Sequence, residues 1–249
     1  MHLQMQEVYN HFIMQKYQKD LDYSYTLGIY PTIELLKAKP EAATRIFTHS
    51  KLTDKNGSQM VKGLAARNNI TIEQNDRLIE KLSPKENCYA VGVFDKYQLK
   101  LGINNHLVLN GIRNFGNLGT IARSMLAFDF YDLAIIQPAV DIFHPSVVRA
   151  SMGAIFSLNF EYFNKLEDYK KKYRNHNFYL FMTDGKNELS QTNFAKPFSL
   201  IFGNESSGLP KSYKQLGETV KINQSSKVDS LNLAVSAGIV MHSCYEKNY

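Results

Sequence analysis

Short apolar segments alternate with amphipathic segments along most of the chain, and this alternation predicts its secondary structure. Apolar runs of roughly four to eight residues predict buried strands, whereas apolar residues spaced about three or four apart predict helices. Nearly continuous apolar strands between helices are typical of a mostly parallel sheet that is covered on both faces. The sequence therefore predicts an α/β protein.

The first hundred residues contain the smaller of two groups of predicted elements. Strands are predicted at 45–50, 69–74 and 89–95, and helices at 32–39, 58–69 and 76–83. The polar stretch at 96–106 is predicted to be a linker. We therefore expect residues 1–98 to form a small α/β domain.

The remaining residues repeat the alternation in a larger unit, which we expect to be a second domain at 104–249. Strands are predicted at 106–112, 132–138, 178–184, 198–204 and 219–223, and helices at 117–128, 146–156 and 230–247. Ligands of a parallel sheet bind beyond the carboxyl ends of its strands. Candidate site residues should therefore follow these strands.

Composition excludes some classes of protein without choosing a function. The chain has 249 residues, of which 44% are hydrophobic and 21% charged, as in an ordinary globular protein. Its first residues do not resemble a signal peptide, and no apolar run approaches the roughly 18–20 residues of a membrane helix, so we expect a cytoplasmic protein without a membrane partner. Cys88 and Cys244 match no metal or redox spacing and are expected to be reduced thiols, and no metal site is predicted. The net charge of +6 fits an RNA-binding protein and a plain basic enzyme almost equally well.

Three segments are unusually rich in Gly, Asn and Ser, and each follows or lies just past a predicted strand. They are NFGNLGTIARS (114–124), LIFGNESSGLP (200–210) and VDSLNLAVSAG (228–238). The glycine spacing of the first segment matches neither a dinucleotide-binding fingerprint nor a P-loop, which argues against a dinucleotide-dependent oxidoreductase. The three segments are the candidate site.

Each notable residue in these segments also has an ordinary structural explanation. Asn117 and Ser230 could cap the helices that follow them. Taken alone, Arg123 is more typical of a surface salt bridge, and Glu205 of a solvated loop. His144, which precedes Pro145, is predicted to start a helix. No segment decides the function by itself.

Together and in this order, the segments resemble the SpoU/TrmH-type RNA 2′-O-ribose methyltransferases of the SPOUT superfamily. The N-x-G-x-x-x-R motif of that family is matched by NLGTIAR (117–123), and its G-x-E-x-x-G-L motif by GNESSGL (203–209). Its S-L-N…A-G-I motif is matched by SLNLAVSAGI (230–239), and VVRASMGA (147–154) resembles its R-A-S-x-G-A segment. Residues 1–98 resemble, more weakly, the ribosomal-protein-like RNA-binding domain that often precedes such enzymes.

The chain departs from the family at two places. The family often has Asp-Pro where this chain has Asn114 and Phe115. It often has Ile-Pro-Met where this chain has Ile-Asn-Gln at 222–224, so a rigid proline is missing from that loop.

The resemblance implies a methyltransferase that uses S-adenosylmethionine to methylate a ribose 2′-hydroxyl in RNA. It also implies a deep trefoil knot in the second domain and a homodimer with the active site near the subunit interface. The separate first domain favours ribosomal RNA, with transfer RNA as the alternative. A non-catalytic RNA-binding protein is a less favoured alternative, because the residues expected of the enzyme are all present. The sequence does not indicate the target nucleotide.

The resemblance assigns a role to each candidate residue. The catalytic residues are expected to be Asn117, Arg123, Glu205, Ser230 and Asn232. The S-adenosylmethionine site is expected to comprise Thr183, Phe202, Gly203, Asn204, Gly208, Ile222 and Leu231. Arg113 and Arg149 are expected to bind RNA, with bracing of its helix an equal alternative for Arg149.

Arg123 matches an arginine that is a proposed general base in the family. Because arginine is almost always protonated, two versions of this role stay open. Arg123 either loses a proton transiently in a desolvated cationic site, or binds a phosphate that itself accepts the proton.

Overall fold

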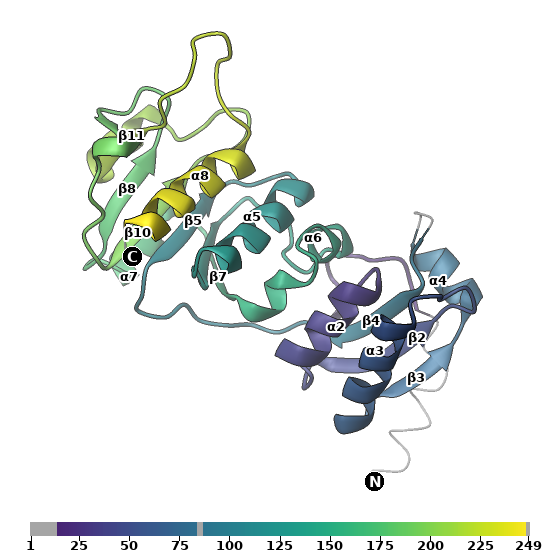
Figure 1. The fold of residues 1–249 in the computed structure, drawn as a ribbon. Helices are drawn as coiled ribbons and strands as arrows, with labels where there is room; N and C mark the ends of the chain where they lie inside the picture. Colours follow the sequence, from purple (N-terminus) through teal and green to yellow (C-terminus); the bar gives the residue numbers. More distant parts are fainter. Residues whose placement is uncertain (1–13, 84–86, 248–249) are drawn as a thin grey trace.

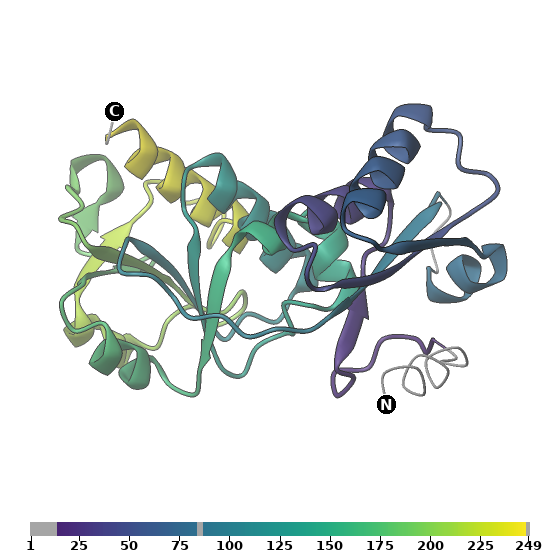
Figure 2. The same ribbon diagram turned by 90° about the horizontal axis from the view of Figure 1, so that it is seen from below.

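The protein contains two β-sheets, one in each half of the chain (Figure 1). The structure is a computed structural model that describes residues 14–83 and 87–247. Figure 2 shows the two halves side by side.

The first sheet is mixed and has the strand order β1-β4-β2-β3. Strands β2 and β3 are parallel, whereas β4 is antiparallel to both β1 and β2. The elements of this half are β1 (Tyr23–Tyr25), α2 (Ile29–Ala38), β2 (Ala43–Thr48), α3 (Lys55–Arg67), β3 (Thr71–Gln74), α4 (Asp76–Leu82) and β4 (Ala90–Asp95). The sequence predicted six of these seven to within a few residues; β1 has only three residues and no detectable alternation.

The second sheet has seven strands in the order β7-β6-β5-β10-β8-β11-β9, and all of its pairs are parallel. Its strands are β5 (His106–Asn110), β6 (Asp132–Ile136), β7 (Asn159–Phe163), β8 (Asn177–Phe181), β9 (Asn187–Glu188), β10 (Phe198–Phe202) and β11 (Glu218–Lys221). Its α-helices are α5 (Phe115–Ala127), α6 (Pro145–Ala150), α7 (Leu166–Lys172) and α8 (Leu233–Glu246), and short 3₁₀ helices are η2 (Ala154–Ser157), η3 (Leu189–Gln191) and η4 (Lys211–Leu216). This architecture confirms the predicted α/β class, while the knot stays a prediction.

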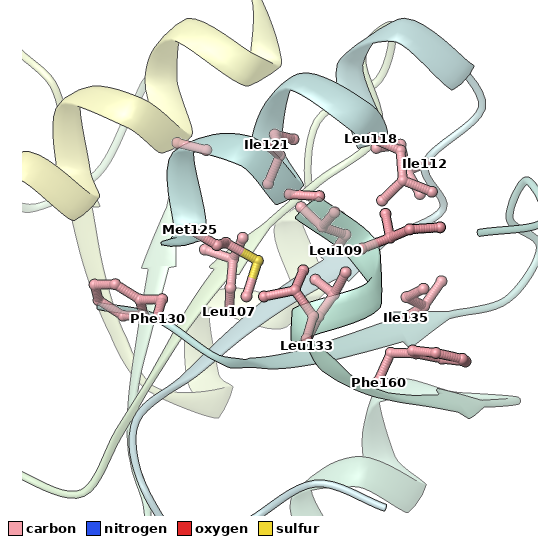
Figure 3. Packing of buried hydrophobic residues seen from close by; sticks show 14 of the residues in the cluster. Leu107, Leu109, Ile112, Leu118, Ile121, Met125, Phe130, Leu133, Ile135 and Phe160 are labelled. Atoms are coloured by element: carbon pink, nitrogen blue, oxygen red, sulfur yellow. The ribbon is translucent and has the colours of Figure 1, made fainter. Parts of the chain in front are cut away.

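Both faces of the second sheet are buried, which explains why its strands are nearly continuous apolar runs. Leu107 and Leu109 of β5 pack beneath α5 and α8, and Figure 3 shows them against Leu118, Ile121 and Met125. Val108, between them, points to the opposite face and belongs to the cluster around α7. Burial of each such side chain stabilises the fold by roughly 1.5–3 kcal/mol.

One helix predicted in the second half is wrong in its extent, and some elements there were not predicted. The helix predicted at 146–156 ends at Ala150, because Met152 and Gly153 have positive φ angles of 53° and 87°, which an α-helix does not accommodate. The turn η2 follows instead. Strand β7 and helix α7 lie in a region for which the pattern predicts no element.

The two halves share a continuous buried core. Phe94 of β4 packs edge-to-face on Phe143 and Phe156, with ring centroids 5.7 and 5.1 Å apart. The Lys96 ammonium lies 3.2 Å from the Asp141 carboxylate. The start of the predicted linker is therefore packed against the second half of the chain, and the predicted boundaries at 98 and 104 stay a prediction.

Candidate active site

A cavity of about 390 Å³ opens beyond the carboxyl ends of β8, β10 and β11. All seven residues predicted to bind a cofactor line it: Thr183, Phe202, Gly203, Asn204, Gly208, Ile222 and Leu231. The predicted catalytic residues Glu205 and Ser230 line it as well. The structure thus brings together two motifs that are about twenty residues apart in the sequence.

The loop after β10 forms the wall of this cavity by folding tightly on itself. A Cβ atom on Gly203 would lie 2.1 Å from the carbonyl carbon of Gly208, so only glycine fits at position 203. The Gly208 N–H donates to the Asn204 carbonyl (2.9 Å), and the Asn204 side chain accepts from the Ser206 N–H (2.9 Å). Gly203 is therefore needed for close backbone approach, whereas Gly208 is favoured by its positive φ angle of 64°.

Glu205 binds the segment that leads into α5. Its carboxylate accepts hydrogen bonds from the backbone N–H groups of Arg113 (3.2 Å) and Asn114 (3.0 Å), and from the side-chain amide of Asn117 (3.2 Å). Burial alone would raise the pKa of Glu205, but these hydrogen bonds and one from its own N–H outweigh it and lower the pKa below its ordinary value. Glu205 is therefore an ionised brace at the start of a helix, where a negative charge is favoured.

Asn117 and Asn232 extend this brace to the last helix. The Asn117 side-chain oxygen accepts from the side-chain amide of Asn232 (3.1 Å). The Asn232 oxygen in turn accepts from the N–H groups of Ala234 (2.8 Å) and Val235 (3.3 Å). Glu205, Asn117 and Asn232, which we call the amide network, thus fix α5, α8 and the cavity loop relative to one another.

Two predicted helix caps are wrong by two or three residues. Asn114, not Asn117, caps α5, since its side chain accepts from the Asn117 N–H (3.0 Å). Asn232, not Ser230, caps α8. Asn114 itself indicates that α5 starts earlier than predicted, because asparagine is a common residue at the start of a helix. His144 does cap α6, as predicted.

The predicted catalytic arginine is not brought into the cavity. Arg123 is exposed on α5, six residues beyond Asn117 and so on a different side of the helix, and it has no hydrogen bond or ion pair with any residue that the structure describes. The Arg113 residue, which is exposed, lies at the loop that Glu205 binds. Within a single chain, Arg123 therefore faces solvent beside the amide network rather than contacting it.

Arg149 points toward the first half of the chain. Burial raises the pKa of the Cys88 thiol, and the Arg149 guanidinium partly offsets that increase. The Nη1 atom of Arg149 is buried without a hydrogen-bond partner among the residues at 14–83 and 87–247.

Cys88 and Cys244 are both buried, and no disulfide joins them.

Several groups around the cavity were not predicted from sequence. Phe181 and Phe202 stack face to face with centroids 4.6 Å apart, and Phe181, Leu209, Leu233 and Ser236 also line the cavity.

Over the described part of the chain, no group of three or more His, Cys, Asp or Glu residues is placed to hold a metal ion. None of the helices described has the length and apolar character needed to cross a membrane.

Two similar proteins with assigned names each match about half of the chain. An uncharacterized tRNA/rRNA methyltransferase of Synechocystis sp. is 30% identical over 139 residues, which are 55% of this chain and 51% of that protein. The 23S rRNA (uridine(2479)-2'-O)-methyltransferase of Streptomyces viridochromogenes is 30% identical over 135 residues, which are 51% of this chain and 47% of that protein. The matches thus span about half the length of these two relatives.

Known structures match over both halves. The SpoU methyltransferase AviRb from Streptomyces viridochromogenes, solved in complex with the cofactor AdoMet, superposes with a TM-score of 0.77 at 19% identity and covers 91% of each chain. Residues 104–242, which contain every motif of the candidate site, match the family described as the SpoU rRNA Methylase family. The chain belongs to this family.

Proposed function

We propose that this protein transfers a methyl group from S-adenosylmethionine to a ribose 2′-hydroxyl of RNA. The observation that carries the proposal is the cavity itself, since residues from two separate motifs line it, and Asn117 of a third motif is joined to them through the amide network. Its volume of about 390 Å³ is within the range of small-molecule sites. The structurally similar AviRb was solved in complex with the cofactor AdoMet.

The chemistry of the lining fits this cofactor. Phe202, Ile222 and Leu231 provide apolar surface for an adenine ring, and the glycine-rich loop exposes backbone groups that can hydrogen-bond to it. The ionised carboxylate of Glu205 at the cavity suits a ligand that carries positive charge. When bound, S-adenosylmethionine supplies an electrophilic methyl group.

The protein's contribution is alignment of the reacting hydroxyl. Glu205 and Asn117 hold the first turn of α5 in place, so the exposed backbone around Arg113 and Asn114 can approach a ribose and its phosphate. Fixing reacting atoms in line is a large source of rate enhancement in a transfer between two bound groups. Ser230 adds a hydroxyl at the edge of the cavity.

We assign Arg123 the role of holding an RNA phosphate, which then accepts the proton of the ribose hydroxyl. A guanidinium is a donor at all ordinary pH values and binds phosphate through two parallel hydrogen bonds. The exposure of Arg123 and its lack of a partner among the described residues leave these donors available. Arg113, which is exposed, is proposed as a further RNA contact, whereas Arg149, whose Nη1 is buried toward the first half of the chain, is assigned to bracing its helix.

Ribosomal RNA is the substrate class that we favour. The relative from S. viridochromogenes is named for ribosomal RNA, and the extra four-stranded half offers a second surface for a large structured RNA. Transfer RNA is the alternative, since the Synechocystis relative is named for both.

We further propose that the protein acts as a homodimer through the exposed side of α5 and α8. A shallow groove there is lined by Thr120, Ser124 and Gly238, and Val235 and Ile239 are 50% and 39% exposed. An apolar surface of this kind on two adjacent helices suits a second copy of the chain. A Val235→Glu substitution should then give monomers in light scattering.

The test is methyl transfer from labelled S-adenosylmethionine to total RNA that lacks the modification. Transfer RNA and the small and large ribosomal RNAs are separated and counted. Label in one ribosomal band, retained in alkali-resistant dinucleotides, is the expected result, because 2′-O-methylation blocks alkaline cleavage. Label in transfer RNA would select the alternative substrate. RNA binding without label in any fraction, including ribosomal particles, would contradict methyl transfer.

A further inference from the structure

A line of aromatic rings leads from the start of α5 to the first half of the chain. Phe115 stacks on His144 with ring centroids 3.9 Å apart and an angle of 16° between the planes. Tyr17 meets the other side of this pair, with its ring 4.9 Å from that of His144 and nearly perpendicular to it. These three residues, the aromatic stack, come from α5, the cap of α6 and the segment before β1.

The position of Phe115 ties the stack to the proposed active site. It directly follows Asn114, whose N–H donates to Glu205, and it precedes Asn117 by two residues. The first turn of α5 therefore carries both the braced loop and the outermost ring of the stack. Figure 1 shows this end of α5 beside α6.

Phe115 contributes little to the protein core. Its side chain is 37% exposed and belongs to none of the buried apolar clusters of the described residues. His144 supports it from beneath and is itself fixed, because its Nδ1 accepts the Ser146 N–H (3.1 Å). A partly exposed aromatic ring, backed by His144, thus lies in the first turn of α5, next to the backbone that Glu205 binds.

The charge beside Phe115 suits a polyanion. Arg113, two residues before Phe115, is exposed. At the other end of the stack, the Lys96 ammonium lies 4.7 Å from the Tyr17 ring centroid but is paired with the Asp141 carboxylate (3.2 Å). A cation beside an exposed aromatic ring is a combination that binds single-stranded nucleic acid, because every base has a flat face that can stack.

We propose that the exposed face of Phe115 stacks on an RNA base next to the nucleotide that is methylated. The inference rests on the proposed function, since it assumes an RNA substrate at the adjoining loop. A stacked neighbour would hold the strand so that the target ribose reaches the cavity. The base contact does not depend on sequence, so Phe115 positions the RNA rather than selecting the nucleotide.

The absence of tryptophan from the chain makes a direct test possible. A Phe115→Trp variant carries a single tryptophan at the stack, and base stacking quenches indole fluorescence. The probe is a 20-nucleotide single-stranded RNA of mixed sequence, and inorganic polyphosphate is the anion without bases. Tyr131→Trp is the matched control, because Tyr131 is also exposed (47%) but lies at the amino end of the second sheet.

The expected result is quenching of the tryptophan at 115 by RNA but not by polyphosphate, with no quenching in the Tyr131→Trp control. RNA binding is measured in parallel by filter retention. RNA that is retained without quenching at 115, or with equal quenching at 131, would overturn the stacking inference while sparing the proposed function. No retention of any RNA would contradict the proposed function itself.

Steady-state kinetics give a second test. Phe115→Leu keeps the apolar bulk but removes the ring, and it should raise the KM for the methylated RNA fraction by roughly tenfold. The change in kcat should be smaller, and binding of S-adenosylmethionine should be unaltered. Phe115→Tyr should restore the wild-type KM. An unchanged KM in Phe115→Leu would contradict the inference.

Discussion

The two ends of the seven-stranded sheet both carry polar residues and a cavity, but they use them differently. At the carboxyl end, about 390 Å³ of space adjoins a carboxylate and amides that are oriented yet accessible. At the amino end a larger hollow of about 1160 Å³ is lined by Asn105, Asp132 and His176, among others. If cavity volume alone were used to locate the active site, the site would therefore be placed at the amino end of the sheet.

The polar groups at the amino end are buried and satisfied by one another. The His106 ring lies 2.8 Å from the Tyr169 hydroxyl, which lies 2.6 Å from the Ser199 hydroxyl. Ser199 is also 2.9 Å from a ring nitrogen of His176. A buried network of this kind stabilises a fold when it is complete, but it has no group left for a ligand.

The comparison shows that access and orientation, not the number of polar groups, distinguish a reactive end from a structural one. At the carboxyl end of the sheet, segments rich in Gly, Asn and Ser are held in place by one ionised carboxylate, that of Glu205. The amino end has titratable side chains whose pKa values are displaced because they are buried. Four substitutions test this difference between the two ends of the sheet.

Removal of the exposed Arg123 guanidinium on α5 should have the largest effect. We expect Arg123→Ala to lower methyl transfer by at least about 100-fold, because it removes the contact that aligns the RNA. Calorimetric binding of S-adenosylmethionine should change little. Arg174→Ala is the control, since Arg174 is also exposed but follows α7 at the amino end. Normal turnover by Arg123→Ala would refute its assigned role.

A single added methyl group should damage the cavity. In Gly203→Ala the new Cβ would meet backbone atoms of Gly208 and Leu209 at 2.1–2.4 Å, so the loop must shift. We expect S-adenosylmethionine binding to weaken by at least about tenfold. Gly63→Ala in α3 meets nothing within 4 Å and should leave cofactor affinity unchanged. Equal affinities for both variants would argue against the cavity as the cofactor site.

At the amino end, the buried His106 should make the stability of the protein depend on pH. Burial is the main cause that lowers the pKa of His106 to about 4, from 6.5. The unfolded chain therefore binds the extra proton first, and stability is lost as the pH falls through 6.5 toward 4. For His106 alone this is roughly 2 kcal/mol of unfolding free energy between pH 7 and pH 5.

Denaturant titrations at a series of pH values test this expectation. In His106→Gln the slope of stability against pH should be shallower over the same range, whatever the absolute stability of the variant. S-adenosylmethionine affinity at pH 7 should match that of the wild-type protein. A slope identical to wild type would contradict a buried neutral His106.

The smallest effect is expected for Asn232→Ala, which distinguishes the capping role of Asn232 from its role in the amide network. Asn232→Ala should cost about 1 kcal/mol through the lost cap of α8, and it should also slow methyl transfer, since Asn117 loses a partner. Asn75→Ala removes the cap of α4, which accepts from the Leu78 N–H (3.1 Å), at a similar cost in stability. Transfer should be unaffected in Asn75→Ala. If both variants lose activity equally, the amide network has no special role.

The sequence predicted what local pattern and motif order can encode. Continuous apolar runs such as residues 198–202 predicted buried strands because both faces of the sheet are covered. The family resemblance predicted the seven residues that line the cavity, and they meet there because a parallel sheet brings the carboxyl ends of its strands together.

What the sequence missed depends on long-range contacts. The pairing of Glu205 with Arg113 and Asn114 joins residues about ninety positions apart, and nothing near Glu205 indicates it. The aromatic stack likewise combines three distant segments. The break after Ala150 depends on the positive φ angle of Met152, a residue type for which that conformation is rare.

The central claim is that the cofactor binds at the carboxyl end of the sheet, and photolabelling tests it most directly. The protein is irradiated with methyl-labelled S-adenosylmethionine, digested and mapped by mass spectrometry. The account predicts label between Phe202 and Ser236, on peptides that line the smaller cavity. Label on peptides that contain residues 103–105, 128–132 or 172–176, at the larger amino-end hollow, would contradict it.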